Sequence, residues 1–370
     1  MQQAELYIGV MSGTSLDGID VVAVDFSKQQ PTLIASFNDQ FPSELHELLH
    51  HIALNKALPI SQIGYATTWL SQCYSDAINH MCDCAGFDKK DVQAIGCHGQ
   101  TVQHHPQPPY PYSIQLNNPS LIAAQTQITT IADFRSKDLA YGGQGAPLVP
   151  AFHHALFGKS DETVVVLNIG GIANISILQA DTPVSGYDTG PGNILLDSWI
   201  NHCRQLPMDE DGRWALTGTI IPELLTALRH DDYFTQPAPK STGREHFNLD
   251  WLQSHLNHQE KPEDVQATLL ELTAITITEP LQNYPSGELL VCGGGAHNSA
   301  LMKRLQNQLP NWQVLTTDEK GIHSDYMEAI AFAWLARQCL KGIAIDMPNI
   351  SGASRASILG GIFQADPIIR

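Results

Sequence analysis

The residues best suited to chemistry lie in a glycine-rich turn between two apolar runs. Residues 6–26 read LYIGVMSGTSLDGIDVVAVDF, and this composition predicts two strands joined by a loop. Glycines let backbone N–H groups approach an anion closely. Hydroxyl donors are supplied by three residues, Ser12, Thr14 and Ser15. Asp17 and Asp20 offer the carboxylate oxygens that Mg²⁺ and its waters prefer. The stretch fits a grip on nucleotide phosphates, and an ordinary Gly/Asp turn is the alternative.

Two further glycine loops follow apolar runs later in the chain. Thr163–Gln179 reads TVVVLNIGGIANISILQ, which again predicts a hairpin, with Gly170 and Gly171 at its tip. Residues 288–292 run into the triple glycine of CGGGAHN. The absence of GxxxxGK[ST] and of GxGxxG argues against a P-loop enzyme and a dinucleotide-binding fold. Three glycine loops in this order indicate nucleotide binding more specifically than one loop does.

Asp188 is the candidate acid or base. It lies in the stretch YDTGPGN, between a strand predicted at 184–187 and a helix predicted from Ile194. A carboxylate at the end of a strand acts as a general base when it lies within hydrogen-bond reach of a nucleophile. The alternative is an aspartate that forms a turn or caps the helix.

His46, Glu47 and His50 match the HExxH pattern of zinc proteases. On a helix the pattern places two imidazoles on one face, with the glutamate as general base for a zinc-bound water. Such a site needs a third ligand, and three fixed positions recur easily by chance in a chain with 16 histidines. A solvated amphipathic helix is therefore the expected structure of this stretch.

Length and composition predict a globular protein of two domains. The chain has 370 residues, 43% hydrophobic and 16% charged, which suits a sizeable core and argues against disorder. A formal charge of −18 without Lys/Arg clusters argues against nucleic acid as a partner, but not against a small anion. No signal-peptide pattern and no apolar run of about 18 residues occur, so no membrane association is expected. Seven cysteines without CxxC spacing favour reduced thiols and a cytoplasmic location.

The elements that would position these residues alternate between strands and helices. Besides the two hairpins, strands are expected at 32–37, 91–97, 129–132, 288–292 and 312–315. Helices are expected at 43–54, 61–84, 121–127, 222–228, 262–279 and 325–339. One more helix is expected to start at Ile194, and another follows the triple glycine and ends near Leu309. Each half opens with a glycine-tipped hairpin, which predicts two related α/β halves with a ligand-binding cleft between them.

Seven motifs occur in order between Tyr7 and about Gly361. They read GVMSGTSLDGID, CHGQT, DFRSKDLAYGGQGAPLVP, NIGGIAN, YDTGPGN, CGGGAHN and DYMEAIAFAWLA. Together they resemble the anhydro-N-acetylmuramic acid kinase family, within the superfamily of sugar kinases, Hsp70 and actin. The resemblance implies two related α/β domains of the actin-like ATPase (ribonuclease H-like) type with an active-site cleft between them. We expect domain I at residues 1–128 plus 342–370, and domain II at 129–341.

The resemblance also implies roles for individual residues. The family's phosphate segment falls on eight consecutive residues, Gly13, Thr14, Ser15, Leu16, Asp17, Gly18, Ile19 and Asp20. Its other nucleotide contacts fall on two glycine pairs, Gly170 with Gly171 at the second hairpin and Gly294 with Gly295 beside the adenosine. Its catalytic aspartate falls on Asp188. The candidate sugar contacts are His98, Gln100, Arg135 and Glu328, which we expect just after strands or at a helix start.

Two of the sugar contacts have a structural alternative. Arg135 would form a fork with the lactyl carboxylate of the sugar, or a surface ion pair with Asp133 or Asp138. Glu328 is an acidic residue at the start of an otherwise apolar helix, where it stabilises the helix dipole or belongs to the site. The resemblance favours the site.

For the whole chain, the resemblance implies a kinase that uses ATP and Mg²⁺ on 1,6-anhydro-N-acetylmuramic acid, a cell-wall sugar. Asp188 would activate a water that attacks C1, and the released O6 would take the γ-phosphoryl group, giving N-acetylmuramic acid 6-phosphate and ADP. This implies a role in peptidoglycan recycling and, from the family, a homodimer. Which aspartate orders Mg²⁺ stays open. The alternatives are a hexose or amino-sugar kinase of the same fold, and a nucleotide-dependent binding protein like Hsp70.

Overall fold

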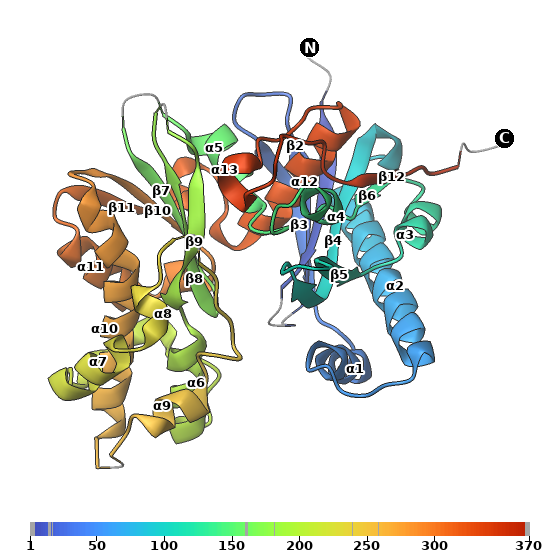
Figure 1. Cartoon of the computed structure of the whole chain (residues 1–370). Coiled ribbons are helices and arrows are strands. Elements are labelled where there is room, and N and C mark those ends of the chain that lie inside the picture. The colour runs from blue at the N-terminus through green and yellow to red at the C-terminus, as the bar shows by residue number, and fades with distance from the viewer. Residues whose placement is uncertain are drawn as a thin grey trace. The chain divides into compact units, whose positions relative to one another are not determined.

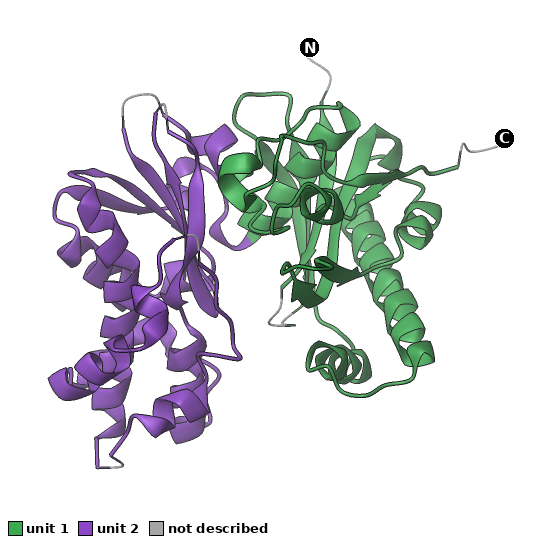
Figure 2. Ribbon diagram, in the orientation of Figure 1, with its two compact units in different colours: residues 1–152, 326–370 green, residues 153–325 purple. Residues whose placement is uncertain are grey.

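The computed structural model describes residues 4–13, 16, 18–159, 162–180, 182–238, 240–257 and 259–366. The chain divides into two compact units, shown in Figures 1 and 2. Unit 1 comprises Met1–Phe152 with Tyr326–Arg370, and unit 2 comprises His153–Asp325. No helix in the described ranges is long and apolar enough to cross a membrane. No disulfide links the seven cysteines, all of which lie in those ranges.

Unit 1 is built on one mixed sheet. Its strands are β1 (Leu6–Ser12), β2 (Ile19–Asp25), β3 (Thr32–Asp39), β4 (Val92–His105), β5 (Tyr112–Leu116), β6 (Thr130–Ala132) and β12 (Gly361–Phe363). They lie in the order β12-β6-β4-β1-β2-β3, and β5 pairs with β4. β1, β2 and β3 form an antiparallel meander, whereas β4 and β6 continue the sheet on the other side of β1 in parallel.

Unit 2 repeats this arrangement. Its strands are β7 (Val164–Ile169), β8 (Ile172–Leu178), β9 (Ser185–Pro191), β10 (Gly287–Cys292) and β11 (Trp312–Thr316). They lie in the order β11-β10-β7-β8-β9. Again the first three strands are antiparallel and the last two add in parallel beside the first. The predicted pair of related α/β halves of ribonuclease H-like type is therefore confirmed by the strand order within each unit.

Helices lie beside both sheets (Figure 1). Unit 1 has α1 (Ser43–Ala53), α2 (Ile60–Ala85), α3 (Pro119–Thr126), α4 (Ser136–Ala140), α12 (Met327–Leu340) and α13 (Pro348–Ser351), and α5 (Val149–Phe157) crosses the boundary. Unit 2 has α6 (Ile194–Arg204), α7 (Pro222–Arg229), α8 (Asp232–Thr235), α9 (Leu249–Ser254), α10 (Pro262–Thr278) and α11 (Ser299–Gln308). The long helices were expected. The four shortest helices, α4, α8, α9 and α13, were not predicted, because too few turns are present to show a period. Nor was α5 predicted, since it begins at the end of the glycine- and proline-rich stretch 142–150, which is typical of a loop.

Two strands are longer than predicted, and this changes where site residues lie. β4 continues to His105 because β5, which was not predicted, pairs with its second half from Gln100 onward. His98 and Gln100 are therefore inside a strand and not just after one. β9 continues through Asp188 to Pro191 because β8 pairs with it along this length. Asp188 is likewise inside a strand and not at its end.

The division into units differs from the expected one at 128/129 and 341/342. β6 belongs to unit 1 because it pairs in parallel with β4, with Ile95 opposite Thr130. α12 also belongs to unit 1 because it packs on β1, β4 and β2. The observed boundaries therefore fall at 152/153 and 325/326.

Helix α12 lies directly on the centre of the first sheet because two glycines leave room for it. Gly9 of β1 and Gly96 of β4 are register partners. A methyl group on Gly9 would overlap the carbonyl oxygen of Ala329, and one on Gly96 would overlap that of Phe332. This approach buries most of the helix and fixes Glu328, which lies in its first turn.

Gly96→Ala is expected to lower the free energy of unfolding by about 3 kcal/mol, since the added methyl group meets a helix carbonyl that cannot turn aside. Urea denaturation measures the loss. Gly64→Ala, inside α2, is the matched control, because a methyl group there meets nothing within 4 Å. It should leave stability unchanged or raise it by up to about 1 kcal/mol. Equal midpoints for the Gly96 variant and the wild type would contradict the close packing.

Candidate active site

The first glycine hairpin is described in part. Thr14, Ser15 and Asp17 lie outside the described residues. The side chains of Leu16 and Ile19 are buried, at 5% and 0% exposure, so these residues offer a ligand only their backbone. The amide of Gln100 joins the hairpin to β4, because its Nε2 donates to the carbonyl oxygen of Gly13 at 3.1 Å. Gly18 lies so close to the Asp39 carbonyl that a side chain there would overlap it.

Asp20, the last residue of the predicted phosphate segment, lies at the start of β2. Its Oδ1 accepts a hydrogen bond from Asn38 Nδ2 at 2.8 Å. It also lies near enough to Glu328 for the two carboxylates to repel each other. Asp20 thus links the first hairpin to the start of α12 within unit 1.

His98 and Arg135 form a direct pair in unit 1. His98 Nε2 accepts from Arg135 Nε at 3.2 Å and lies 2.8 Å from Arg135 Nη2. A guanidinium group has no acceptor, so the imidazole is neutral and carries its proton on Nδ1. Burial and then the charge of Arg135 hold the pKa of His98 well below its usual range. Its buried Nδ1 forms no hydrogen bond of good geometry with any described residue, although the Gly99 backbone lies near enough to raise the pKa of His98, so this N–H can donate to a ligand.

The remaining donors of Arg135 are held by the loop after α4. Nη1 donates to the carbonyl oxygen of Gly145 at 2.6 Å, and the N–H of Gly145 donates to Asp138 Oδ2 at 2.7 Å. Asp138 Oδ1 accepts from the hydroxyl of Ser351 at 2.6 Å. Three of the five guanidinium N–H groups are thus used by His98 and Gly145, and two stay available.

The ion-pair alternative for Arg135 has no support among the described residues. Asp133 accepts from the backbone N–H of Ser136, and Asp138 holds the loop described above. Burial lowers the pKa of Arg135 to about 10, and the charges of Glu328 and Asp138 oppose this shift. The guanidinium remains a cation at neutral pH inside the protein.

Glu328 completes the group of candidate sugar contacts. Burial raises its pKa, the nearby Arg135 opposes the rise, and Asp20 adds to it. Three of the four predicted residues are therefore neighbours, because Arg135 contacts His98 and lies near Glu328, whereas Gln100 donates to Gly13 of the first hairpin. Gln100 also offers a ligand an acceptor, because its Oε1 is buried and has no hydrogen-bond partner among the described residues.

In unit 2, the predicted base Asp188 lies at an irregularity in the pairing of β8 and β9. It is opposite Asn174, and the register shifts between Ala173 and Asn174. Such bulges often re-aim a side chain next to an active site. Burial raises the pKa of Asp188 to about 6, the N–H of Thr242 opposes the rise, and the charge of Glu245 adds to it. A carboxylate with this pKa is ionised at neutral pH and basic enough to take a proton.

One segment holds Asp188 in place. Asp188 Oδ2 accepts from the backbone N–H of Thr242 at 3.0 Å, and its own N–H donates to the carbonyl of Lys240 at 3.0 Å. Its carbonyl accepts from the hydroxyl of Tyr233 at 2.6 Å. The ammonium group of Lys240 donates to the carbonyls of Tyr233 and Phe234 in α8. Because β9 is an edge strand, this segment takes the place of a neighbouring strand.

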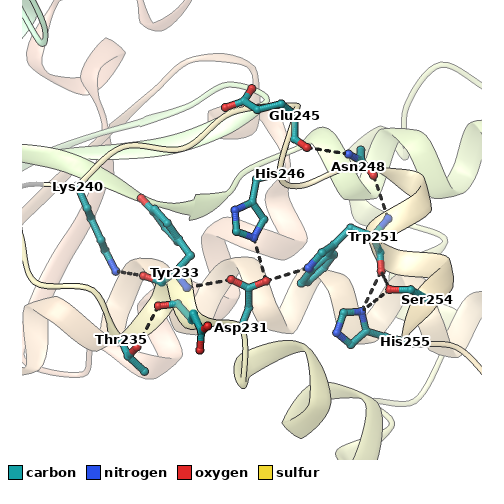
Figure 3. A network of polar contacts seen from close by, with 11 residues as sticks. Asp231, Tyr233, Thr235, Lys240, Glu245, His246, Asn248, Trp251, Ser254 and His255 are labelled. Carbon is teal, nitrogen blue, oxygen red and sulfur yellow. Dashed lines mark hydrogen bonds and ion pairs between the residues drawn. The ribbon is translucent and has the colours of Figure 1, made fainter. Parts of the chain in front are cut away.

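Asp231 holds the segment that follows it, from Tyr233 to Trp251, by several hydrogen bonds (Figure 3). It accepts from the backbone N–H of Tyr233, from His246 Nε2 and from Trp251 Nε1, each at 2.9 Å. Burial alone would raise the pKa of Asp231, but these hydrogen bonds hold it below its usual value. The segment beyond Lys240 is therefore fixed at both ends, with Thr242 pointing its N–H at Asp188.

Tyr233→Phe is expected to lower kcat about tenfold, because it removes only the hydrogen bond that fixes the Asp188 peptide group. The acid limb of the pH profile should move from about 6 toward lower pH, since burial is the main cause of the raised pKa and a looser segment reduces it. Tyr284→Phe is the control in the same unit. A kcat and an acid limb equal to wild type would show that Tyr233 does not position Asp188.

The glycines of unit 2 separate into open and packed positions. A methyl group on Gly170 or Gly171 would approach no atom closer than 3.7 Å, which is ordinary van der Waals contact, so close packing does not require glycine at either position. Gly294 is similarly open, with Asn193 Nδ2 at 3.7 Å as the nearest atom. Gly295 is not, because a methyl group there would overlap the side chain of Ile169. Packing against Ile169 of β7 therefore requires glycine at position 295, so this residue type is not by itself a sign of ligand binding.

The HExxH stretch lies on α1, as expected for a solvated helix. The rings of His46 and His50 stack with centroids 6.4 Å apart, and Glu47 is exposed. No group of three His, Cys, Asp or Glu residues that could hold a metal ion occurs in the part of the chain that the structure describes. This gives a zinc protease no support.

Sequence reasoning missed Tyr233, Lys240 and Thr242. Tyr233 and Thr242 lie 45 and 54 positions from Asp188 in the chain. No local pattern marks them, because their contribution to Asp188 comes from a hydroxyl group and from backbone groups. Only the fold brings this segment to the edge of β9.

The chain is similar to known proteins over nearly its whole length. Residues 5–365 match the family model for anhydro-N-acetylmuramic acid kinase. The anhydro-N-acetylmuramic acid kinase of Vibrio vulnificus (strain CMCP6) is 49% identical over 368 residues, covering 98% of this chain and 100% of that protein. The enzyme of the same name from Aliivibrio fischeri is 50% identical over 366 residues, covering 98% and 100%.

Two solved structures align with most of the chain at low sequence identity. Component A of (R)-2-hydroxyglutaryl-CoA dehydratase from Acidaminococcus fermentans has a TM-score of 0.48 at 10% identity, covering 89% of this chain and 96% of that chain. A ROK family glucokinase from Streptomyces griseus, in complex with glucose and AMPPNP, has a TM-score of 0.42 at 13% identity, covering 90% and 99%. From the family model and the close relatives, the chain belongs to the anhydro-N-acetylmuramic acid kinase family.

Proposed function

We propose that this kinase opens the 1,6-anhydro ring of 1,6-anhydro-N-acetylmuramic acid with water and transfers the γ-phosphoryl group of ATP to O6. The products are N-acetylmuramic acid 6-phosphate and ADP, which fits a role in peptidoglycan recycling. In the anhydro sugar O6 is bonded to C1 and has no proton, so the base acts on water and not on a sugar hydroxyl. Water adds to C1, the C1–O6 bond breaks, and O6 forms a bond to phosphorus as ADP leaves.

The observation that carries this proposal is the state of Asp188. Its half-buried carboxylate has a pKa raised to about 6 by burial and is oriented by the N–H of Thr242. Such a group can take a proton from water at neutral pH and release it to solvent afterwards. An ordinary aspartate, with a pKa near 3.8, would be a weaker base.

The group around Arg135 supports recognition of the sugar. Two guanidinium N–H groups that are not used by any described residue suit a carboxylate such as the lactyl group of muramic acid. The Nδ1–H of His98 and the Oε1 of Gln100 are a buried donor and a buried acceptor without partners among the described residues. A sugar carries hydroxyl and acetamido groups that satisfy both kinds of atom.

The residues also fit ATP with Mg²⁺. Gly170, Gly171 and Gly294 are not required by close packing, since a methyl group on each would meet no atom closer than 3.7 Å, and without a side chain their backbone N–H groups are accessible to phosphate oxygens. Asp20 is a carboxylate at the start of β2, beside the first hairpin, and Mg²⁺ in kinases takes one or two carboxylates plus phosphate oxygens and waters. Asp20, at the end of the predicted phosphate segment, would hold the ion, which would neutralise charge on the transferring phosphoryl group when bound.

The test is a reaction of the purified protein with the anhydro sugar and ATP in ¹⁸O-water, followed by mass spectrometry. We expect a phosphorylated and hydrated sugar with the label on C1. Label in the phosphate would rule out attack at the anomeric carbon. Phosphorylation of free N-acetylmuramic acid, with the anhydro form left untouched, would indicate an ordinary amino-sugar kinase instead.

A further inference from the structure

Arg244 is an arginine whose side chain has no hydrogen-bond or ion-pair partner among the described residues. The chain carries 20 Lys and Arg against 38 Asp and Glu. Every other described arginine has a hydrogen bond, an ion pair or an aromatic ring, namely Arg135, Arg204, Arg213, Arg229, Arg304, Arg337 and Arg355. Arg244 is exposed, and its guanidinium makes no hydrogen bond or ion pair within the described ranges, although Glu245 is its neighbour.

The guanidinium of Arg244 lies over the tip of the second glycine hairpin. A methyl carbon built on Gly171 would be 3.9 Å from Arg244 Nη2 and 4.0 Å from its Nε. The tip itself is rigid, because the carbonyl of Gly171 accepts from the N–H groups of Gly192 and Ile194 at 2.9 and 3.1 Å. A cation and an open glycine therefore face the same space in unit 2.

Hydrogen bonds on both sides of Arg244 hold its backbone in place. Two residues earlier, the N–H of Thr242 is bonded to Asp188. On the other side, Asn248 Nδ2 donates to the carbonyl of Arg244 at 3.2 Å. Beyond that, His246 and Trp251 are fastened to Asp231 (Figure 3). The segment that orients Asp188 thus also carries the cation to the glycine tip.

We propose that Arg244 binds the phosphate groups of the nucleotide at the second glycine hairpin. The inference deepens the proposed function and rests on its nucleotide. A formal charge of −18 repels a polyphosphate, so a cation at its binding point has a large relative effect. A guanidinium group matches phosphate oxygens with paired N–H donors, which a lysine ammonium does not. Because the same segment holds Asp188, phosphate binding and the position of the base are mechanically linked.

The test measures binding of adenosine, ADP and a non-hydrolysable ATP analogue to the full-length protein with Mg²⁺ by calorimetry. Arg244→Gln should weaken the ATP analogue about tenfold or more and leave adenosine unchanged. Arg244→Lys should bind the ATP analogue with an affinity between those of the wild type and Arg244→Gln, because lysine keeps the positive charge but lacks the paired N–H donors of the guanidinium group. Arg213→Gln, which removes one exposed cation from the same unit, is the matched control and should bind all three ligands as the wild type does.

Two results would overturn the inference while leaving the proposed function intact. In one, Arg244→Gln binds the ATP analogue as tightly as the wild type. In the other, it loses adenosine as strongly as the analogue, which would mean a damaged site and not a lost phosphate contact. A wild-type protein that binds none of the three ligands would instead remove the proposed function, and the inference with it.

Discussion

Asp188→Asn is expected to lower kcat by a factor of about 10²–10⁴, the usual contribution of a general base, while the ATP analogue still binds. Asparagine keeps the size of the side chain and can still accept the hydrogen bond from Thr242. It cannot take a proton from water, so hydrolysis of the anhydro ring stops. Steady-state kinetics and calorimetry with the analogue measure the two effects separately.

The wild-type pH profile gives an independent check on the same residue. The base must be ionised, so kcat/KM for the sugar should fall as pH drops through the raised pKa of Asp188, about 6. His98 should add no second limb in this range, because burial and Arg135 hold its pKa well below 6.5. An acid limb near pH 4 would show that the catalytic carboxylate is not a buried one.

Asp188→Asn should also be more stable than the wild type at alkaline pH. The folded pKa of Asp188 is raised above its unfolded value, so its ionisation costs stability as pH rises through about 6. Asparagine has no such cost, and after discounting for partial exposure we expect a gain of about 1–2 kcal/mol at pH 8. The gain should vanish below the unfolded pKa of 3.8. Urea denaturation at both pH values measures it.

Asp250→Asn is the control for all three measurements, since Asp250 is an exposed carboxylate of the same unit. It should keep normal kcat and should not show the pH-dependent gain in stability. Near-normal turnover in Asp188→Asn would show that Asp188 is not the base.

Arg135→Gln is expected to lower kcat/KM for the anhydro sugar by about 10² or more, because two charged hydrogen bonds to the ligand are lost. The variant also releases His98, whose Nε2 accepts from the guanidinium. The sharper measurement is a ratio: kcat/KM for 1,6-anhydro-N-acetylmuramic acid over that for the same sugar without its lactyl group. We expect a large ratio in the wild type and a ratio near one in the variant.

The control for Arg135 is Arg355→Gln, which removes a guanidinium lying over the ring of Tyr141 in the same unit. It should keep the wild-type ratio. Binding of the ATP analogue by Arg135→Gln shows whether the variant is folded. A folded variant that keeps the preference for the lactyl group would show that Arg135 does not bind its carboxylate.

The sequence alone determined the elements with a strong local signal. Both glycine hairpins, the long helices and the repeated order of strands and helices were predictable, because alternation, glycine turns and helix caps act over a few residues. The sequence also named the candidate residues in unit 1, and the structure brings Arg135 to His98 and Gln100 to Gly13.

Only the tertiary structure decided how these residues are held. Asp188 lies inside an edge strand, and its backbone is completed by Lys240 and Tyr233 from another part of the chain. The raised pKa of Asp188 comes from burial, which no residue type encodes by itself. The place of Arg244 over Gly171 likewise depends on a segment without local regularity. Sequence patterns report contacts along one element, whereas these contacts arise where separate elements meet.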